Sequence, residues 1–184
     1  MRFKGVNTWE SPEYLTPLQN YVKTISGLRS ENYINLKVDR AAAWWILYDG
    51  KWIVGFSGVQ IPDSWLNKKV ARIMYRTYLA PEVRGKGMNP TRHNWYYSGE
   101  KQITFCQSFG LTPVISREET GGVNAARNIV KKLNEIYDQK KWTLLPGHYY
   151  TCKGEPKDNP KCWQRLVCYG DTRHVQKLPH KMVL

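Results

Sequence analysis

Two segments of the chain place apolar residues at helical spacing. In residues 11–26, "SPEYLTPLQNYVKTIS", the apolar positions 15, 18, 22 and 25 form one stripe of a helix. Ser11 before Pro12 predicts the start of this helix, because Ser is a favoured N-cap and Pro suits the first helical position. Pro17 leaves open a division into a turn and a shorter helix. Residues 123–137 carry apolar side chains at spacings of 3, 4, 3 and 4, which predicts a second amphipathic helix.

Between these helices the pattern predicts a meander of three strands. Residues 42–48 read as a buried strand, and the following "YDGKW" predicts a hairpin, because Asp-Gly favours a two-residue reversal. Residues 51–61, "KWIVGFSGVQI", form the returning strand, and residues 70–79, "VARIMYRTYL", form the third. We expect these consecutive strands to be antiparallel.

The second half of the chain alternates between helix and strand. A helix is predicted from 89 or 91 to 109, with Gly110 as its stop. One face of it would carry Trp95, Gly99, Ile103, Cys106 and Phe109. A short strand at 111–116 follows, and after the helix at 123–137 come two more strands, in 141–152 and 161–170. In the last strand, alternation places Leu166 and Cys168 on one side and Val167 and Tyr169 on the other.

This order of elements predicts an α+β fold. The chain of 184 residues shows no internal repeat and no interdomain linker. We therefore expect one domain over residues 1–170, with a central, mostly antiparallel mixed sheet flanked by helices. Residues 171–184 are expected to form a loose basic tail.

Charge narrows the class of partner without selecting one. The net charge is +13, and 41% of the residues are hydrophobic and 23% charged, which is an ordinary globular composition. A nucleotide cofactor, a nucleic acid and an acidic protein all suit such a charge. A protein with a basic face and no specific anionic partner would have the same charge. The basic residues form no run of five or six, which argues against a disordered basic tail.

Membrane and metal partners are not expected. No stretch approaches the roughly 18–20 apolar residues of a membrane span, and "MRFKGVNTWE" lacks the apolar core of a signal peptide, so a cytoplasmic protein is expected. The four cysteines are then free thiols. Five possible metal ligands share one segment, but their spacings match no common zinc site. They are His148, Cys152, Cys162, Cys168 and His174.

A basic glycine turn follows the strand at 70–79 and precedes a predicted helix. The stretch "PEVRGKGMN" brings several backbone N–H groups together beside the positive end of that helix. Glycines let the backbone approach phosphate oxygens closely, and Arg84 or Lys86 could neutralise their charge. The turn is therefore a candidate phosphate site, although a solvated glycine turn fits the same residues. It is not a P-loop, because no G-x-x-x-x-G-K-[ST] occurs.

The order of the elements together with this turn resembles the GNAT (Gcn5-related N-acetyltransferase) family. The family signature is Gln/Arg-x-x-Gly-x-Gly/Ala after the fourth strand, commonly preceded by Pro-Glu. Arg84, Gly87 and Asn89 occupy the three signature places here, with Pro81 and Glu82 before them. Asn at the third place departs from the pattern, but it tolerates left-handed and capping conformations. The resemblance covers about residues 40–170.

The resemblance implies acetyl-coenzyme A as co-substrate and places its site. Backbone amides of the turn would clasp the pyrophosphate, and Thr77 and Leu79 would pair with the pantetheine arm like an added strand. Asn124 resembles the Asn that often opens the next helix and contacts the cofactor, although it also suits a helix cap. The turn residues are Arg84, Gly85, Lys86, Gly87, Met88 and Asn89.

The resemblance assigns no catalytic residue. The strand at 70–79 has no carboxylate, and Lys131 stands where the family often has a Tyr, seven residues after Asn124. Candidate substitutes each have a second interpretation as a surface carboxylate, a packed ring or a solvated imidazole. They are Glu118 or Glu119 as the base, Tyr75, Tyr97 or Tyr137 as the proton donor, and His93 as another base.

Two functions from different classes follow. The first is an N-acetyltransferase that moves an acetyl group from acetyl-coenzyme A to an amine of a protein or a small molecule. The positive charge favours an acidic protein acceptor over a polyamine or an aminoglycoside. The second is a catalytically inactive GNAT-fold protein that binds nucleic acid or an acidic partner through its basic surface. Asn89, Lys131 and the missing strand carboxylate favour the second.

Overall fold

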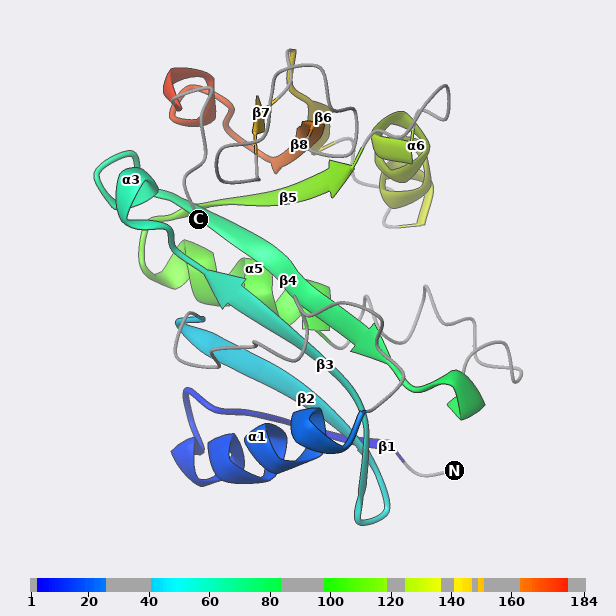
Figure 1. Cartoon of the computed structure of the whole chain (residues 1–184). Helices are drawn as coiled ribbons and strands as arrows, with labels where there is room; N and C mark the ends of the chain where they lie inside the picture. Colours follow the sequence, from blue (N-terminus) through cyan, green and yellow to red (C-terminus); the bar gives the residue numbers. More distant parts are fainter. Residues whose placement is uncertain are drawn as a thin grey trace. The chain divides into compact units, whose positions relative to one another are not determined.

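The computed structural model describes residues 3–25, 41–83, 98–118, 125–136, 141–146, 149–150 and 163–178. The chain forms two compact units (Figure 1). The first comprises Met1–Gln60 and Ile73–Gln102, and the second comprises Ile61–Arg72 and Ile103–Leu184. Strand β4 (Val70–Leu79) begins in the second unit and ends in the first. The single domain predicted over residues 1–170 stays a prediction.

The first unit contains the predicted meander. Its strand order is β1 (Phe3–Asn7), β2 (Ala43–Asp49), β3 (Trp52–Gln60) and β4. The β1–β2 and β2–β3 pairs are antiparallel, and Gly50, with a φ of 58°, turns the hairpin as the Asp-Gly pair predicts. Strand β1 was not predicted, because five residues with a central glycine give little periodic signal.

The first predicted helix divides into a short turn and a shorter helix, with the division between Tyr14 and Leu15. A 3₁₀ turn at Pro12–Tyr14 precedes α1 (Leu15–Thr24), in which Pro17 lies in the first turn. Ser11 precedes the 3₁₀ turn, but its side chain makes no capping hydrogen bond. In Figure 1, α1 lies beside β1 and β2. Its Leu18 and Val22 are buried in a core with aromatic side chains from the strands, including Trp44, Phe56, Tyr75 and Tyr78.

The second unit contains the parallel part of the sheet. A short helix, α3 (Asp63–Leu66), precedes β4, whose first residues pair in parallel with β5 (Thr112–Glu118). Strand β8 (Trp163–Tyr169) is antiparallel to β5, and β6 (Trp142–Leu144) and β7 (Tyr149–Tyr150) are each antiparallel to β8. The fold is thus α+β with a mixed sheet, as predicted.

Two further helices come before and after β5 in sequence. Helix α5 (Glu100–Ser108) ends before Gly110, as predicted, and Gly110 adopts a φ of 66°. Cys106 of the predicted face is buried, as is Gln102. Phe109, which was predicted on the same face as Cys106, follows the helix end and is 51% exposed. Trp95 lies outside the described residues.

Helix α6 (Ala125–Ile136) confirms the second amphipathic stripe. Ala126 and Leu133 are buried in it. The side chain of Asn134 bonds both backbone groups of Trp142, donating to its carbonyl oxygen and accepting from its N–H, each at 3.1 Å. These two bonds tie α6 to the start of β6. No helix of the described residues is long and apolar enough to span a membrane.

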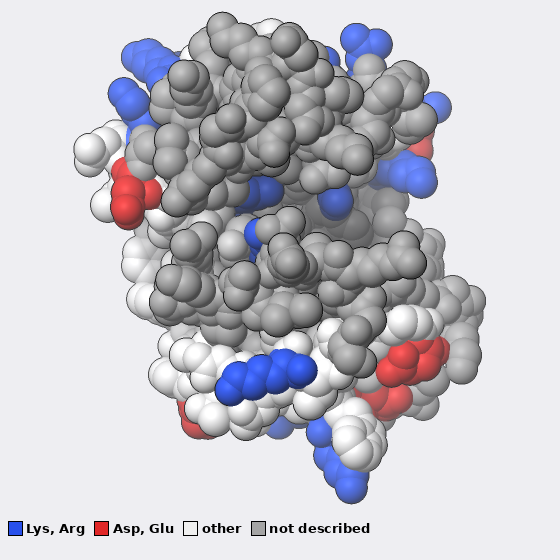
Figure 2. All heavy atoms as spheres, viewed as in Figure 1, with Lys and Arg blue, Asp and Glu red and all other residues white. Residues whose placement is uncertain are grey.

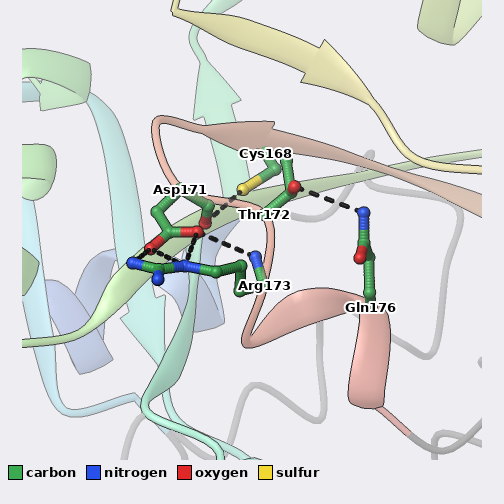
Figure 3. A network of polar contacts seen from close by, with 5 residues as sticks. All are labelled: Cys168, Asp171, Thr172, Arg173 and Gln176. Atoms are coloured by element: carbon green, nitrogen blue, oxygen red, sulfur yellow. Dashed lines mark hydrogen bonds and ion pairs between the residues drawn. The ribbon is translucent and has the colours of Figure 1, made fainter.

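The expectation of a loose tail from residue 171 is wrong for residues 171–178. Val175 and Leu178 are buried in the core of the second unit, and a 3₁₀ turn spans Val175–Lys177. The Asp171 carboxylate accepts hydrogen bonds from the backbone N–H and the guanidinium of Arg173, as Figure 3 shows. Burial of Val175 and Leu178 stabilises this segment by roughly 1.5–3 kcal/mol for each side chain, which is enough to hold it against the unit.

Candidate functional site

Strand β4 contains two residues in the left-handed region of backbone conformation. Met74 has a φ of 54° and Arg76 a φ of 50°. For a residue with a side chain, this conformation costs roughly 1–2 kcal/mol of free energy, and residues of a regular strand do not adopt it. Such strain persists where surrounding groups hold it, and it gathers at functional sites. The next residues, Thr77 and Leu79, are those expected to contact a bound acyl donor.

A ring of hydrogen bonds holds Met74. Its backbone N–H donates to Oε1 of Gln102 at 2.7 Å, and Nε2 of Gln102 donates to Oγ of Ser57 at 3.0 Å. The hydroxyls of Ser57 and Thr77 are 3.0 Å apart, and Thr77 donates to the carbonyl oxygen of Met74 at 2.9 Å. Because a hydroxyl has one proton, Ser57 donates to Thr77, and the ring closes.

The ring lies inside the first unit. Ser57 is 1% exposed and Gln102 is 0% exposed, and the bonds of the ring satisfy the hydroxyl of Ser57 and both ends of the Gln102 carboxamide. Hydroxyls of Ser57 and Ser98 also lie 3.5 Å from Sδ of Met74. A buried polar network of this kind is rigid when all its members are paired. Met74 is therefore held by both its backbone and its side chain.

Tyr75 packs in the core. It is 6% exposed, and its ring centroid lies 6.0 Å from that of Trp44. The guanidinium of Arg76 lies 5.6 Å from the same ring. Of the two interpretations of Tyr75, proton donor or packed ring, this geometry supports the packed ring.

A pair of tyrosines joins α1 to the end of β4. The rings of Tyr21 and Tyr78 lie 6.4 Å apart, and their side chains are hydrogen-bonded. Burial raises the pKa of Tyr21 well above its ordinary value, and the neighbouring Tyr78 and the charge of Glu82 raise it further. Tyr21 is therefore a neutral hydrogen-bonding group at physiological pH.

The described chain leads directly into the predicted phosphate turn. After Leu79, the N–H of Ala80 donates to the carbonyl of Val54 at 2.8 Å, and a 3₁₀ turn follows at Pro81–Val83 with Val83 buried. All of the turn from Arg84 to Asn89 lies outside the described residues, and so does Asn124. The same holds for His93, Tyr97, Glu119 and Tyr137, and for the side chain of Glu118.

Lys131, where the family often has a tyrosine, lies on the surface. It is 77% exposed and pairs with Glu135 at 3.9 Å, one turn further along α6. Such an exposed pair contributes little stability. On the face drawn in Figure 2, the described Lys and Arg side chains stand singly or in small groups, with acidic groups among them.

The two described cysteines are buried thiols. Burial raises the pKa of Cys106 to about 12, and burial together with the charge of Asp171 raises that of Cys168 to about 12. A thiol with such a pKa is neither a good nucleophile nor a ready metal ligand at neutral pH. Among the described residues no three His, Cys, Asp or Glu side chains gather as a metal site.

Solved structures that are similar to this chain in fold include N-acyltransferases. The ribosomal-protein-S18-alanine N-acetyltransferase of Escherichia coli matches with a TM-score of 0.52 and 11% identity, over 100% of this chain and 97% of that one. An acyl-CoA N-acyltransferase of Pseudomonas aeruginosa matches with a TM-score of 0.52 and 10% identity, over 92% and 99%. An acetyltransferase of the GNAT family from Streptococcus pneumoniae matches with a TM-score of 0.49 and 10% identity, over 92% and 100%.

No protein-family profile and no curated protein sequence matches the chain. The fold is nevertheless that of the GNAT acetyltransferases, as the sequence predicted. Sequence reasoning missed Ser57 and Gln102. A signal for Gln102 existed, because it lies three residues after Gly99 and four before Cys106, on the face predicted to be buried.

Proposed function

We propose that this protein is an N-acyltransferase that moves an acetyl group from acetyl-coenzyme A to an amine. The observation that carries the proposal is the shape of β4, which has left-handed residues at 74 and 76 and is followed by the 3₁₀ turn at Pro81–Val83, directly before the predicted phosphate turn. The parallel register with β5 runs from Val70 to Arg72, and β4 continues from there to Leu79. An extended ligand arm can bind beside a strand as a further strand would, through hydrogen bonds to its backbone.

Each part of the donor then has a proposed contact. Backbone groups of Thr77 and Leu79 bind the pantetheine arm, and the amides between Arg84 and Asn89 bind the pyrophosphate. Asn124 contacts the cofactor from the start of the next helix. The thioester supplies an activated acyl group. A backbone N–H near Leu79 stabilises the negative charge that develops on its carbonyl oxygen.

The acceptor amine must lose a proton before or during attack. A free Lys amine has a pKa of about 10.4, so a base or an ordered water is needed. The candidate bases His93 and Glu119, and the side chain of Glu118, lie outside the described residues. Tyr75, a candidate proton donor, is a packed ring. We propose that positioning and water carry the loss of the proton. The charge of +13 favours an acidic protein as the acceptor.

A second candidate function is a GNAT-fold protein that does not catalyse. The position of Lys131 favours it, because an exposed, ion-paired lysine stands where the family often has a tyrosine. Such a protein would use its positive charge on nucleic acid or on an acidic protein. Its binding would weaken as salt is added.

Calorimetric titration of acetyl-coenzyme A and coenzyme A separates the two functions. The wild type should bind both, and Gly87→Glu should abolish binding, because it places a carboxylate and a Cβ at the predicted pyrophosphate site. Gln19→Glu is the matched control, since it makes the same change of charge at an exposed position of α1. The wild type could instead bind neither ligand and be retained on heparin in a salt-dependent way. That result would overturn the proposed acyltransferase function and support the second candidate function.

A further inference from the structure

We infer that Gln102 is a positioning residue for the acyl-donor site. Its carboxamide, together with Ser57 and Thr77, holds Met74 in the left-handed conformation and thereby sets the backbone of Thr77 and Leu79. The inference rests on the proposed function, and it assigns a role to side chains that would not themselves touch the donor.

The geometry supports a clamp on the backbone. Within a regular strand, backbone N–H and C=O groups bond to neighbouring strands. Here the N–H of Met74 donates to Gln102, at 2.7 Å, and its C=O accepts from Thr77, at 2.9 Å. Ser57 of β3 joins these two side chains and so ties the clamp to the middle of the sheet.

The clamp offsets a conformation that Met74 and Arg76 would not adopt alone. Their φ values of 54° and 50° cost free energy that must be repaid by neighbouring groups. Without the carboxamide, the Met74 N–H and the Ser57 hydroxyl would each lose a partner inside the protein. Relaxation of Met74 to an extended conformation would then be favoured. That relaxation turns the following peptide groups, including those of Thr77 and Leu79, away from their present directions.

The chemistry of the carboxamide is specific. It must accept one hydrogen bond and donate another, which a protonated carboxylic acid also does and a carboxylate does not. The groups bonded to it or to its partners are Met74, Ser57, Thr77 and Ser98, and none of these side chains titrates between pH 5 and 9. With Gln102→Glu the clamp should therefore depend on pH. It should be intact while the acid is protonated and broken once the acid ionises.

Two variants test the role. Gln102→Met keeps the length of the side chain and removes both hydrogen bonds. Gln102→Glu keeps them only while the acid is protonated, and burial raises the pKa of such an acid above its ordinary value. Leu18→Ala is the control, because it weakens the core of the first unit at α1 without touching the ring.

Two measurements are compared at a temperature at which every variant is folded. Calorimetry gives the affinity for acetyl-coenzyme A, and hydrogen–deuterium exchange gives the protection of the amides from 74 to 79. Gln102→Met should bind roughly tenfold more weakly and exchange these amides roughly tenfold faster, as loss of a buried hydrogen bond predicts. Leu18→Ala should bind like the wild type.

The pH profile distinguishes positioning from a loss of packing. Relative to the wild type, Gln102→Glu should bind equally at pH 5.5 and roughly tenfold more weakly at pH 8.5. This variant also serves if Gln102→Met does not fold. A Gln102→Glu variant whose affinity relative to the wild type is the same at both pH values overturns the inference.

The two proposals fail in different ways. A wild type that binds no acetyl-coenzyme A overturns the proposed function and this inference with it. A wild type that binds, beside a Gln102→Met that binds equally well, overturns the inference alone. Equal weakening by Gln102→Met and Leu18→Ala also overturns it, because the effect would then come from lost stability.

Discussion

Oε1 of Gln102 accepts a hydrogen bond from the backbone N–H of Met74, at 2.7 Å, although the two residues are 28 positions apart in the sequence. A side chain of α5 thus satisfies a backbone group of β4. The shape of β4 beyond Met74, which leads to the predicted phosphate turn, depends on a residue far away in the chain.

Loss of the Thr77 hydroxyl should destabilise the first unit. Thr77→Val keeps the shape of the side chain, but it leaves the Met74 carbonyl without its donor and Ser57 without its acceptor. We expect a loss of about 1–3 kcal/mol in the free energy of unfolding. Urea denaturation measures it, with Thr16→Val at an exposed position of α1 as the control. Equal stability of the two variants would contradict the prediction.

A methyl group at Gly58 should be costly. A Cβ there would lie 3.0 Å from the ring of Trp44, which is buried with its centroid 5.8 Å from that of Phe56. Because this ring cannot move away easily, we expect Gly58→Ala to lose about 1–3 kcal/mol. A double-mutant cycle with Trp44→Phe tests the cause. If the two losses simply add, steric contact with Trp44 is not the reason.

The bonds from Asn134 to Trp142 should stabilise the second unit. Asn134→Ala removes both bonds, so the backbone N–H and carbonyl oxygen of Trp142 must bond to water instead. We expect a loss of about 1–3 kcal/mol, measured by thermal or urea unfolding. Asn128→Ala, an exposed residue of the same helix, removes the same side chain without these bonds. A similar loss in both variants would point to helix propensity instead.

The buried thiols should make the protein less stable at alkaline pH. Burial raises the pKa of Cys106 and of Cys168 from 9.0 to about 12. The folded state therefore holds these protons more tightly than the unfolded state does. This contribution to stability is complete below pH 9 and is lost as the pH rises toward 12.

Melting temperatures between pH 7.5 and 11.5 measure this loss. Cys106→Ala and Cys168→Ala should each flatten the alkaline decline. In Cys152→Ala/Cys162→Ala, where only the two described thiols remain, iodoacetamide at pH 8 should react after denaturation and hardly before. Rapid alkylation of the folded variant would show that these thiols are accessible.

Asp171 should remain ionised in acid. Hydrogen bonds from Arg173 lower the pKa of its carboxyl to about 2. The contribution of the pair is present above the ordinary value of 3.8 and is lost as the pH falls toward 2. An NMR titration of the carboxyl carbon should give the low pKa, and Arg173→Gln should return it toward 3.8. An unchanged pKa in that variant would exclude Arg173 as the cause.

Much of the fold follows from local patterns. The stripes at 11–26 and 123–137, the Asp-Gly hairpin and the Gly110 stop each depend on residues close together in sequence, and the structure confirms them. Strand β1 was missed because it is short, and the packing of residues 171–178 was missed because two apolar residues in a basic segment give almost no periodicity. The phosphate turn was predicted from its residues alone, and both the turn and its contacts stay a prediction.

The amino-acid sequence by itself determined the order of helices and strands and the class of fold, because those depend on periodicity, turn residues and caps. Only the tertiary structure decided the conformation of β4. Met74 and Arg76 have no intrinsic preference for positive φ, and nothing local predicts it. Only after the chain has folded can the Met74 N–H donate to Gln102 and the Met74 carbonyl oxygen accept from Thr77, while Ser57 bonds to both of these side chains. These bonds offset the strain.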